Sequence, residues 1–309
     1  MKTLKILTGR NVKLFFRDKG IFFTALITPM ILLVLYTTFL GNIYKDSVEA
    51  MLEGVNAALP SPVVLEESIL NGYVGGQLIS SVLAVSCVTV AICCNMLMVQ
   101  DKVTGAERDL ICSPLKPSVL ALSYYIATLI STFIICFACL GVSLVYLAIV
   151  GFYMSFADVM LVALDVVILV NLGTAMSSVI AFFLSSQGQI SAVGTVISSG
   201  YGFICGAYMP ISQFADGLRN AVCMLPGTHG TSLLRRHALR GVTEKMKEAG
   251  VPDGALRGIR DSVDYHIYLF EREIPVWVMY LVLVGTVALL IGAYILLHYL
   301  KSRKIIFKK

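Results

Sequence analysis

Long apolar runs, separated by polar stretches, are the feature that most restricts how this chain can fold. Several of them reach the roughly 20 residues that a helix needs to cross about 30 Å of hydrocarbon. Backbone groups inside lipid must hydrogen-bond within the protein, so these runs predict helices; they are too long and too uniformly apolar for barrel strands. Charged residues make up 14% of the 309 residues, against roughly 25% in a soluble domain. The sequence therefore predicts an all-α polytopic membrane protein.

The apolar runs predict six membrane-spanning helices in a single transmembrane domain that covers residues 1–309. The spans are expected at about 21–40, 74–99, 119–150, 159–184, 190–209 and 275–300. Ahead of them, Lys2, Arg10, Lys13 and Arg17 fall on one face of a helix, opposite a mainly apolar face. This pattern predicts a basic amphipathic helix over residues 1–20 that lies along the membrane surface. The alternative is a basic tail without defined structure.

The distribution of Lys and Arg predicts how the chain is oriented in the cell membrane. These residues gather in three flanks, which are 1–20, 100–118 and 301–309. The segment after the first span instead carries Lys45 among several carboxylates. Short flanks rich in positive charge stay in the cytoplasm. Both termini and the loop 100–118 are therefore expected to be cytoplasmic, and the segments 43–72 and 210–274 extracytoplasmic, although 210–274 carries many Arg residues.

The loop between the second and third spans is short and highly charged. Its centre reads Gly105-Ala106-Glu107-Arg108-Asp109-Leu110-Ile111, which predicts one or two turns of helix on the membrane surface. A loop that only reverses the chain needs no more than Gly, Ser and Asn. Acidic, basic and aliphatic side chains together favour a surface for another protein. The alternative is a polar loop whose charges only fix the orientation.

The chain lacks sequence motifs for chemistry of its own. No Gly-x-x-x-x-Gly-Lys-Ser/Thr phosphate loop occurs in it, so any ATP would be bound by another protein. The four His residues do not cluster at metal-ligand spacing, and the Cys residues within the spans are expected to pack as small apolar groups. The sequence therefore predicts that the chain is not an enzyme and holds neither a metal nor a cofactor.

Two blocks of sequence resemble the ABC-2 permease family, the membrane subunits of ABC exporters that include drug-resistance permeases. In the cytoplasmic loop the matching residues are Asp101, Gly105, Leu110-Ile111 and Ser113-Pro114. After the fifth span they are Cys205-Gly206, Met209-Pro210, Leu225-Pro226-Gly227-Thr228-His229 and Leu234-Arg235. The chain departs from the family at Ala106-Glu107-Arg108, where a Thr-aliphatic-Glu sequence is usual. The charged stretch 241–273 is also longer than the family leads us to expect.

The resemblance implies a transporter of several subunits in the cell membrane. Two permeases, identical or paralogous, would pair within the lipid, and two ABC ATPase subunits carrying ATP and Mg would dock on the cytoplasmic side. No nucleic acid is expected as a partner. The substrate would be a hydrophobic or amphipathic molecule, such as a drug, antibiotic, peptide or lipid, as in multidrug efflux. The expected ATPase-coupling residues are Gly105, Glu107, Arg108, Asp109 and Leu110.

The resemblance also implies short re-entrant helices between the fifth and sixth spans. They would form an external gate, and its expected residues are Pro210, Pro226, His229 and Arg235.

The candidates for a substrate path come partly from the residues and partly from the resemblance. Asp165 is the only charged residue in any predicted span, and an intramembrane carboxylate is a functional candidate. Asn171 and Thr174 follow it at helical spacing, and the resemblance adds Tyr201 and Phe203 at the dimer seam. The alternatives are that Asp165 reaches the membrane surface or is protonated, and that the small polar residues serve helix packing.

Two other classes of protein remain open from the sequence. One is an ion-coupled secondary transporter or channel without an ATPase, although such carriers tend to place several polar groups near the bilayer midplane. The other is a membrane-embedded enzyme, for which no clustered His, Asp or Ser residues provide support.

Overall fold

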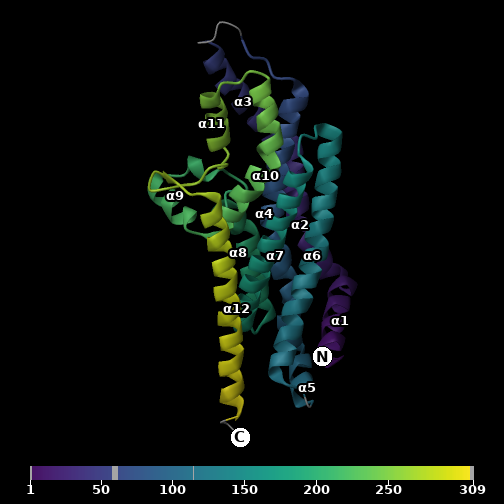
Figure 1. The fold of residues 1–309 in the computed structure, drawn as a ribbon. Helices are drawn as coiled ribbons and strands as arrows, with labels where there is room; N and C mark the ends of the chain where they lie inside the picture. The colour runs from purple at the N-terminus through teal and green to yellow at the C-terminus, as the bar shows by residue number, and fades with distance from the viewer. Residues whose placement is uncertain (1, 58–61, 114, 307–309) are drawn as a thin grey trace.

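The computed structural model is a bundle of long helices that run along one common axis (Figure 1), and it describes residues 2–57, 62–113 and 115–306. Pro114 and residues 58–61 of the predicted extracytoplasmic segment lie outside the described residues. Within the described part, five helical stretches are long and apolar enough to cross a membrane: Lys19–Gly54, Glu67–Thr104, Pro117–Val150, Phe156–Phe183 and Val276–Lys301. The predicted all-α polytopic membrane fold is confirmed.

The first membrane stretch extends further than the sequence predicted. It begins with α2 (Lys19–Leu35), passes through a single π-helical turn, η1 (Tyr36–Leu40), and continues as α3 (Gly41–Asn56). Asp18 caps α2 by accepting a hydrogen bond from the Ile21 amide. The sequence predicted only a polar extracytoplasmic segment after the first span, whereas the buried Tyr44, Val48 and Leu52 of α3 hold this part of the chain as a helix against the protein.

The helix α4 (Glu67–Thr104) is the central element of the bundle, and nearly all its residues between Ile69 and Asp101 are buried. It packs against α2, α6 (Pro117–Val150), α7 (Phe156–Phe183), α8 (Gln187–Ile204) and α10 (Pro226–Glu248). At Gly173 of α7 an added Cβ atom would overlap the Cys87 carbonyl oxygen of α4. Only glycine allows the two backbones to approach so closely.

The helix α8 occupies the position of the predicted fifth span, 190–209. It has 18 residues and begins with Gln187, Gly188 and Gln189, and it is not among the five stretches apolar enough to cross a membrane. Ser186 caps its first turn by accepting a hydrogen bond from the Gln189 amide. The six-span arrangement therefore remains a prediction.

Between α8 and the last helix, the chain forms a more elaborate structure than the short helices predicted for it. The elements are η2 (Ile211–Gln213), α9 (Asp216–Cys223), α10 (Pro226–Glu248), α11 (Asp253–Asp261) and a two-stranded hairpin of β1 (Tyr268–Leu269) with β2 (Arg272–Glu273). The expectation of short helices is wrong for α10, which has 23 residues and packs along α4, α7 and α12 (Val276–Ile306). Pro226 lies at its first helical position, where the missing N–H costs nothing.

The positions of the elements along the axis separate two ends of the molecule (Figure 1). The amphipathic helix α1 (Lys2–Arg17), the short helix α5 (Ala106–Cys112) and the last turns of α12 lie at one end. The helices α3 and α11 lie at the other end, and α9 lies beside the beginning of α12. The charged loop, the basic amphipathic helix and residues 301–306 of the basic tail thus gather at one end of the bundle.

Candidate functional site

The helix α1 is attached to the bundle by a charged contact at its middle. Arg10 Nη1 lies 2.8 Å from Asp101 Oδ2, and its Nη2 lies 3.3 Å from Oδ1, so both guanidinium nitrogens engage one carboxylate. The Tyr124 hydroxyl of α6 donates a hydrogen bond to the same carboxylate at 2.5 Å. Hydrogen bonding to Asp101 raises the pKa of Arg10 above its ordinary value. The contact joins α1, α4 and α6 through a bidentate geometry that fixes orientation as well as distance.

The turn from α4 into α5 depends on Gly105. This residue has φ of 87°, a left-handed conformation that glycine adopts without the steric cost of a Cβ atom. Three residues earlier, in α4, Lys102 Nζ donates hydrogen bonds to the carbonyl oxygens of Ala181, Phe182 and Leu184, at the C-terminal end of α7. Because a Lys side chain satisfies these orphaned carbonyls, the ends of α4 and α7 are held together.

The side chains of α5 divide between the protein and the surroundings. Glu107 points back to α12, where its Oε1 lies 3.3 Å from Lys301 Nζ. Leu110 packs partly buried against the cluster that contains Met98 and Leu120. The side chains of Arg108 and Asp109 are exposed and make no hydrogen bond or ion pair with the described residues. The outer face of α5 thus presents the basic Arg108 and the acidic Asp109 next to Ile111, which is 38% exposed.

An apolar groove runs between α2, α4 and α8 and encloses about 860 Å³. Its walls carry Ile27, Ile31 and Phe39 from the first membrane stretch, and Ser198 and Phe203 from α8. Several of these apolar side chains are more than half exposed. In a membrane-spanning protein such an apolar surface faces lipid, a neighbouring protein or an apolar ligand.

The structure separates the predicted substrate-path residues. Phe203 lines the groove, whereas Tyr201 packs toward α10. A Cβ atom added to Gly227 of α10 would lie 2.7 Å from the Tyr201 hydroxyl oxygen. Asn171 donates a hydrogen bond to the Val167 carbonyl of its own helix, and Thr174 is fully buried. Neither of these residues of α7 lines the groove.

Asp165 lies in the interior of the bundle and has two partners there. Its Oδ2 lies 2.6 Å from His237 Nδ1 of α10, and its Oδ1 accepts a hydrogen bond from the Tyr280 hydroxyl of α12 at 2.7 Å. The carboxylate therefore connects three helices. This geometry supports a role in positioning α10 rather than in lining the groove.

Replacing Asp165 with leucine is expected to lower the free energy of unfolding by about 1–3 kcal/mol, because His237 and Tyr280 would lose their buried acceptor. Asp165→Asn should cost less, since an amide oxygen still accepts one bond. The measurement is thermal unfolding in detergent, with Glu244→Gln on the exposed face of α10 as the control. Equal unfolding temperatures for Asp165→Leu and the control would exclude this positioning role.

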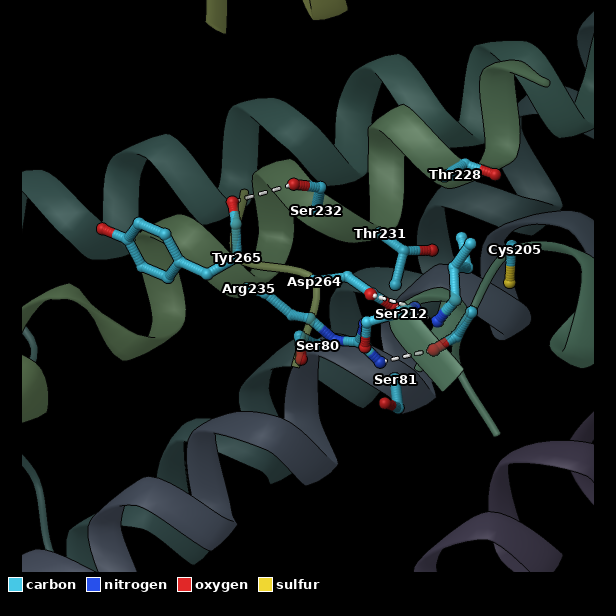
Figure 2. Close-up of polar contacts among 12 residues, drawn as sticks. Ser80, Ser81, Cys205, Ser212, Thr228, Thr231, Ser232, Arg235, Asp264 and Tyr265 are labelled. Atoms are coloured by element: carbon cyan, nitrogen blue, oxygen red, sulfur yellow. Dashed lines mark hydrogen bonds and ion pairs between the residues drawn. The ribbon is translucent and has the colours of Figure 1, made fainter. Parts of the chain in front are cut away.

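A second buried ion pair holds the chain just after α8 (Figure 2). Arg235 of α10 is fully buried; its Nη1 lies 3.1 Å from Asp264 Oδ2, and its Nη2 donates a hydrogen bond to the Gly206 carbonyl at 2.5 Å. Asp264 also accepts hydrogen bonds from the amides of Ile211 at 2.6 Å and Ser212 at 2.9 Å. One carboxylate and one guanidinium thus fix both sides of the turn that leaves α8.

The electrostatics of this pair follow from its burial. Desolvation raises the pKa of Asp264 above its ordinary value, while the Arg235 charge and the two amide donors act in the opposite direction. A buried charge pair tolerates the loss of both partners far better than the loss of one. The turn is therefore held in one conformation by a contact that is costly to break from either side.

The other predicted gate residues lie around this turn. Pro210 precedes η2, Pro226 begins α10, and His229 follows in the first turn of α10, where it is 3% exposed. Asp264, the partner of Arg235, was not predicted from the sequence. It lies 29 residues further along the chain in the charged stretch 241–273, and no local pattern marks it.

Comparison with known proteins adds one match. A family model described as "ABC-2 type transporter" matches residues 2–237. The matched region runs from α1 into α10, so it includes the Arg10–Asp101 contact, α5, the groove and Arg235, and it ends before Asp264. No curated protein matches the chain.

Proposed function

The chain belongs to the ABC-2 type transporter family, and on that premise we propose that it is the permease of an exporter driven by a separate ATP-binding cassette ATPase. Membership makes it a membrane permease component of an ABC transporter. The direction of transport, the substrate and the pairing of subunits belong to the proposal. The observation that carries the proposal is the outer face of α5, where the neighbouring side chains of Arg108 and Asp109 are both exposed. The helix that carries them is attached to α12 through Glu107 and Lys301.

The frame behind α5 supports a coupling role. A force applied to α5 reaches α12 through Glu107 and Lys301, α7 through Lys102, and α1 through Asp101 and Arg10. Packed helices joined by such contacts move as rigid bodies and do not deform gradually. Closure of an ATPase dimer below α5 would therefore displace several membrane helices together.

The groove between α2, α4 and α8 supports a route for hydrophobic or amphipathic substrates. Its walls are mainly apolar, and the polar side chains along α8 are Ser191, Thr195, Ser198 and Ser199. A second permease, identical or paralogous, would cover the groove and close the route from lipid. This pairing is the dimer that the proposal requires, with membrane lipids around it.

The arrangement of the two ends supports an orientation with both termini in the cytoplasm. The Lys- and Arg-rich segments lie at the same end as α5, and α3 and α11 lie at the opposite end (Figure 1). Positive flanks face the cytoplasm. The region between α8 and α12 would then face outward, with the Arg235–Asp264 turn as the external gate.

The contacts of Asp165 bear on the secondary-transporter alternative. An ion-coupled carrier needs polar groups that exchange ions near the midplane. Both oxygens of Asp165 are already engaged by His237 and Tyr280, and the side chain is buried. The geometry therefore favours the ATPase-driven function.

Purification from native membranes in a mild detergent tests the proposal. We expect the chain to co-purify with a soluble ATPase that carries a phosphate loop, and the complex to hydrolyse Mg-ATP. A lysine-to-alanine change in that phosphate loop is the matched control and should abolish hydrolysis without dissociating the complex. Purification of the chain alone from intact membranes, without ATP hydrolysis, would contradict the proposal.

A further inference from the structure

A cavity of about 320 Å³ opens between η2, α9 and the β1–β2 hairpin. The helix α9 contributes Arg219 and Cys223 to its wall, the hairpin contributes Tyr268 and Glu271, and Asp261 comes from the end of α11. The cavity is in the size range of small-molecule sites, which combine apolar walls with a few placed polar groups. None of its residues takes part in the coupling end or the apolar groove.

Arg219 provides the cavity with an incompletely paired cation. Its Nη2 lies 2.8 Å from Asp216, but its Nε is buried and has no hydrogen-bond partner among the described residues. The Arg219 side chain lines the cavity and is 34% exposed, so an anionic oxygen there would meet a guanidinium whose charged partner is the exposed Asp216. The planar guanidinium matches the geometry of a phosphate group.

The other side of the cavity carries carboxylates. Glu271, at the tip of the hairpin, is exposed and makes no hydrogen bond or ion pair with the described residues. Asp261 accepts a hydrogen bond from the Tyr268 hydroxyl at 3.1 Å and lies 2.6 Å from His266 Nδ1. A cation on one wall and a free carboxylate on the other complement a ligand that bears both charges, with a phosphate and an ammonium group.

The surroundings of the cavity are those of a membrane interface. Leu218 of α9, Met224 directly after α9, Phe270 of the hairpin and Trp277 of α12 are each more than half exposed. The Phe270 amide donates a hydrogen bond to Asn220 Oδ1, which holds the hairpin tip over α9. Trp277 lies in the first turn of α12, and tryptophan is enriched where a membrane helix meets the headgroups. In Figure 1, α9 lies beside this end of α12.

We propose that this cavity binds the headgroup of a zwitterionic phospholipid with a primary ammonium, taken from the leaflet at the beginning of α12. The phosphate lies against Arg219, the ammonium donates to Glu271, and the acyl chains follow the exposed apolar residues. Asp264 also lines the cavity, and its carboxylate holds the turn after α8. The lipid thus sits against the element that fixes this turn. The site does not depend on the ATPase-driven function.

Native mass spectrometry of the purified full-length chain tests the site, with dioleoyl phosphatidylethanolamine, phosphatidylcholine and phosphatidylglycerol as the probes. We expect the ethanolamine lipid to bind most tightly. Arg219→Gln removes a charge-assisted contact and should weaken its binding about tenfold. Arg272→Gln, on the exposed strand of the same hairpin, is the matched control and should bind as the unchanged protein does. Glu271→Gln should remove the preference for the ethanolamine lipid over the glycerol lipid.

Three results would overturn the proposal. One is unchanged binding of the ethanolamine lipid by Arg219→Gln. Another is equal binding of the three lipids by the unchanged protein. The third is binding of free phosphoethanolamine as tight as that of the lipid, which would identify a soluble ligand as the occupant. If Arg219→Gln folds poorly, Glu271→Gln still decides the test. Glu271 is exposed, so its replacement should leave the fold intact.

Discussion

Arg235→Met is expected to destabilise the region between α8 and α12 by about 3–5 kcal/mol, because it leaves the Asp264 carboxylate buried without its cation. The Gly206 carbonyl loses its guanidinium donor in the same change. The native thiol of Cys205, directly before Gly206 and 1% exposed, reports on the opening of this turn. Its rate of modification by a small maleimide should rise about 100-fold or more, since each 1.4 kcal/mol is tenfold.

Two further variants make this result specific to the pair. Arg257→Met removes an exposed Arg that pairs with Glu273 and should change stability by less than about 1 kcal/mol. Arg235→Met combined with Asp264→Leu removes both charges and should recover much of the lost stability. If Arg235→Met reacts no faster at Cys205 than Arg257→Met does, the ion pair does not hold the turn.

Exchanging the charges of Arg108 and Asp109 is expected to uncouple the permease from its ATPase. The double variant Arg108→Glu, Asp109→Lys keeps the net charge of the chain. It places each new side chain opposite a group of the same charge on the ATPase. Breaking a buried charge pair at an interface costs about 2–5 kcal/mol, which weakens an association at least tenfold. The measurement is the amount of ATPase that co-purifies and the ATP hydrolysis per permease. Because both side chains are exposed, the chain itself should fold and insert normally.

A charge exchange at the opposite end of the molecule serves as the matched control. Lys45→Glu with Asp46→Lys on α3 also swaps neighbouring charges at constant net charge, and it should leave ATPase association unchanged. Full ATPase association and full ATP hydrolysis in the α5 variant would contradict the coupling role. The charges of the loop would then serve only to orient the chain in the membrane.

The sequence predicted those elements whose signal is local. Hydropathy identified the spans at α4, α6, α7 and α12, and the mixed charges of 105–111 identified α5, because each pattern lies within its own element. It did not predict the pairs that hold the site together. Arg10 and Asp101 are separated by 91 residues, and His237 and Asp165 by 72. Helical periodicity contains no information about which distant element supplies a partner.

The helix α10 shows why hydropathy misjudged the region after α8. Its charged residues placed it in the predicted extracytoplasmic segment 210–274 with only short helices, since a hydropathy scale treats every charge as exposed to water. In the structure Arg235 is neutralised by Asp264, Arg236 donates to the Tyr265 carbonyl, and His237 meets Asp165. Paired in this way, charged side chains can be buried in a packed helix. Whether each of these side chains can be buried depends on its partner in a distant part of the chain.

Chemical crosslinking from Cys112 tests the coupling assignment most directly. All eight cysteines lie in the described part of the chain, and Cys112, at the end of α5, is the only exposed one. In native membranes, a thiol-to-amine crosslinker on Cys112 should join the chain to an ABC ATPase, and Cys112→Ser should abolish the product. A membrane-impermeant maleimide should leave Cys112 unmodified in intact cells. Modification from outside, or efficient reaction of Cys112 without any linked ATPase, would contradict the assignment of α5 as the cytoplasmic coupling element.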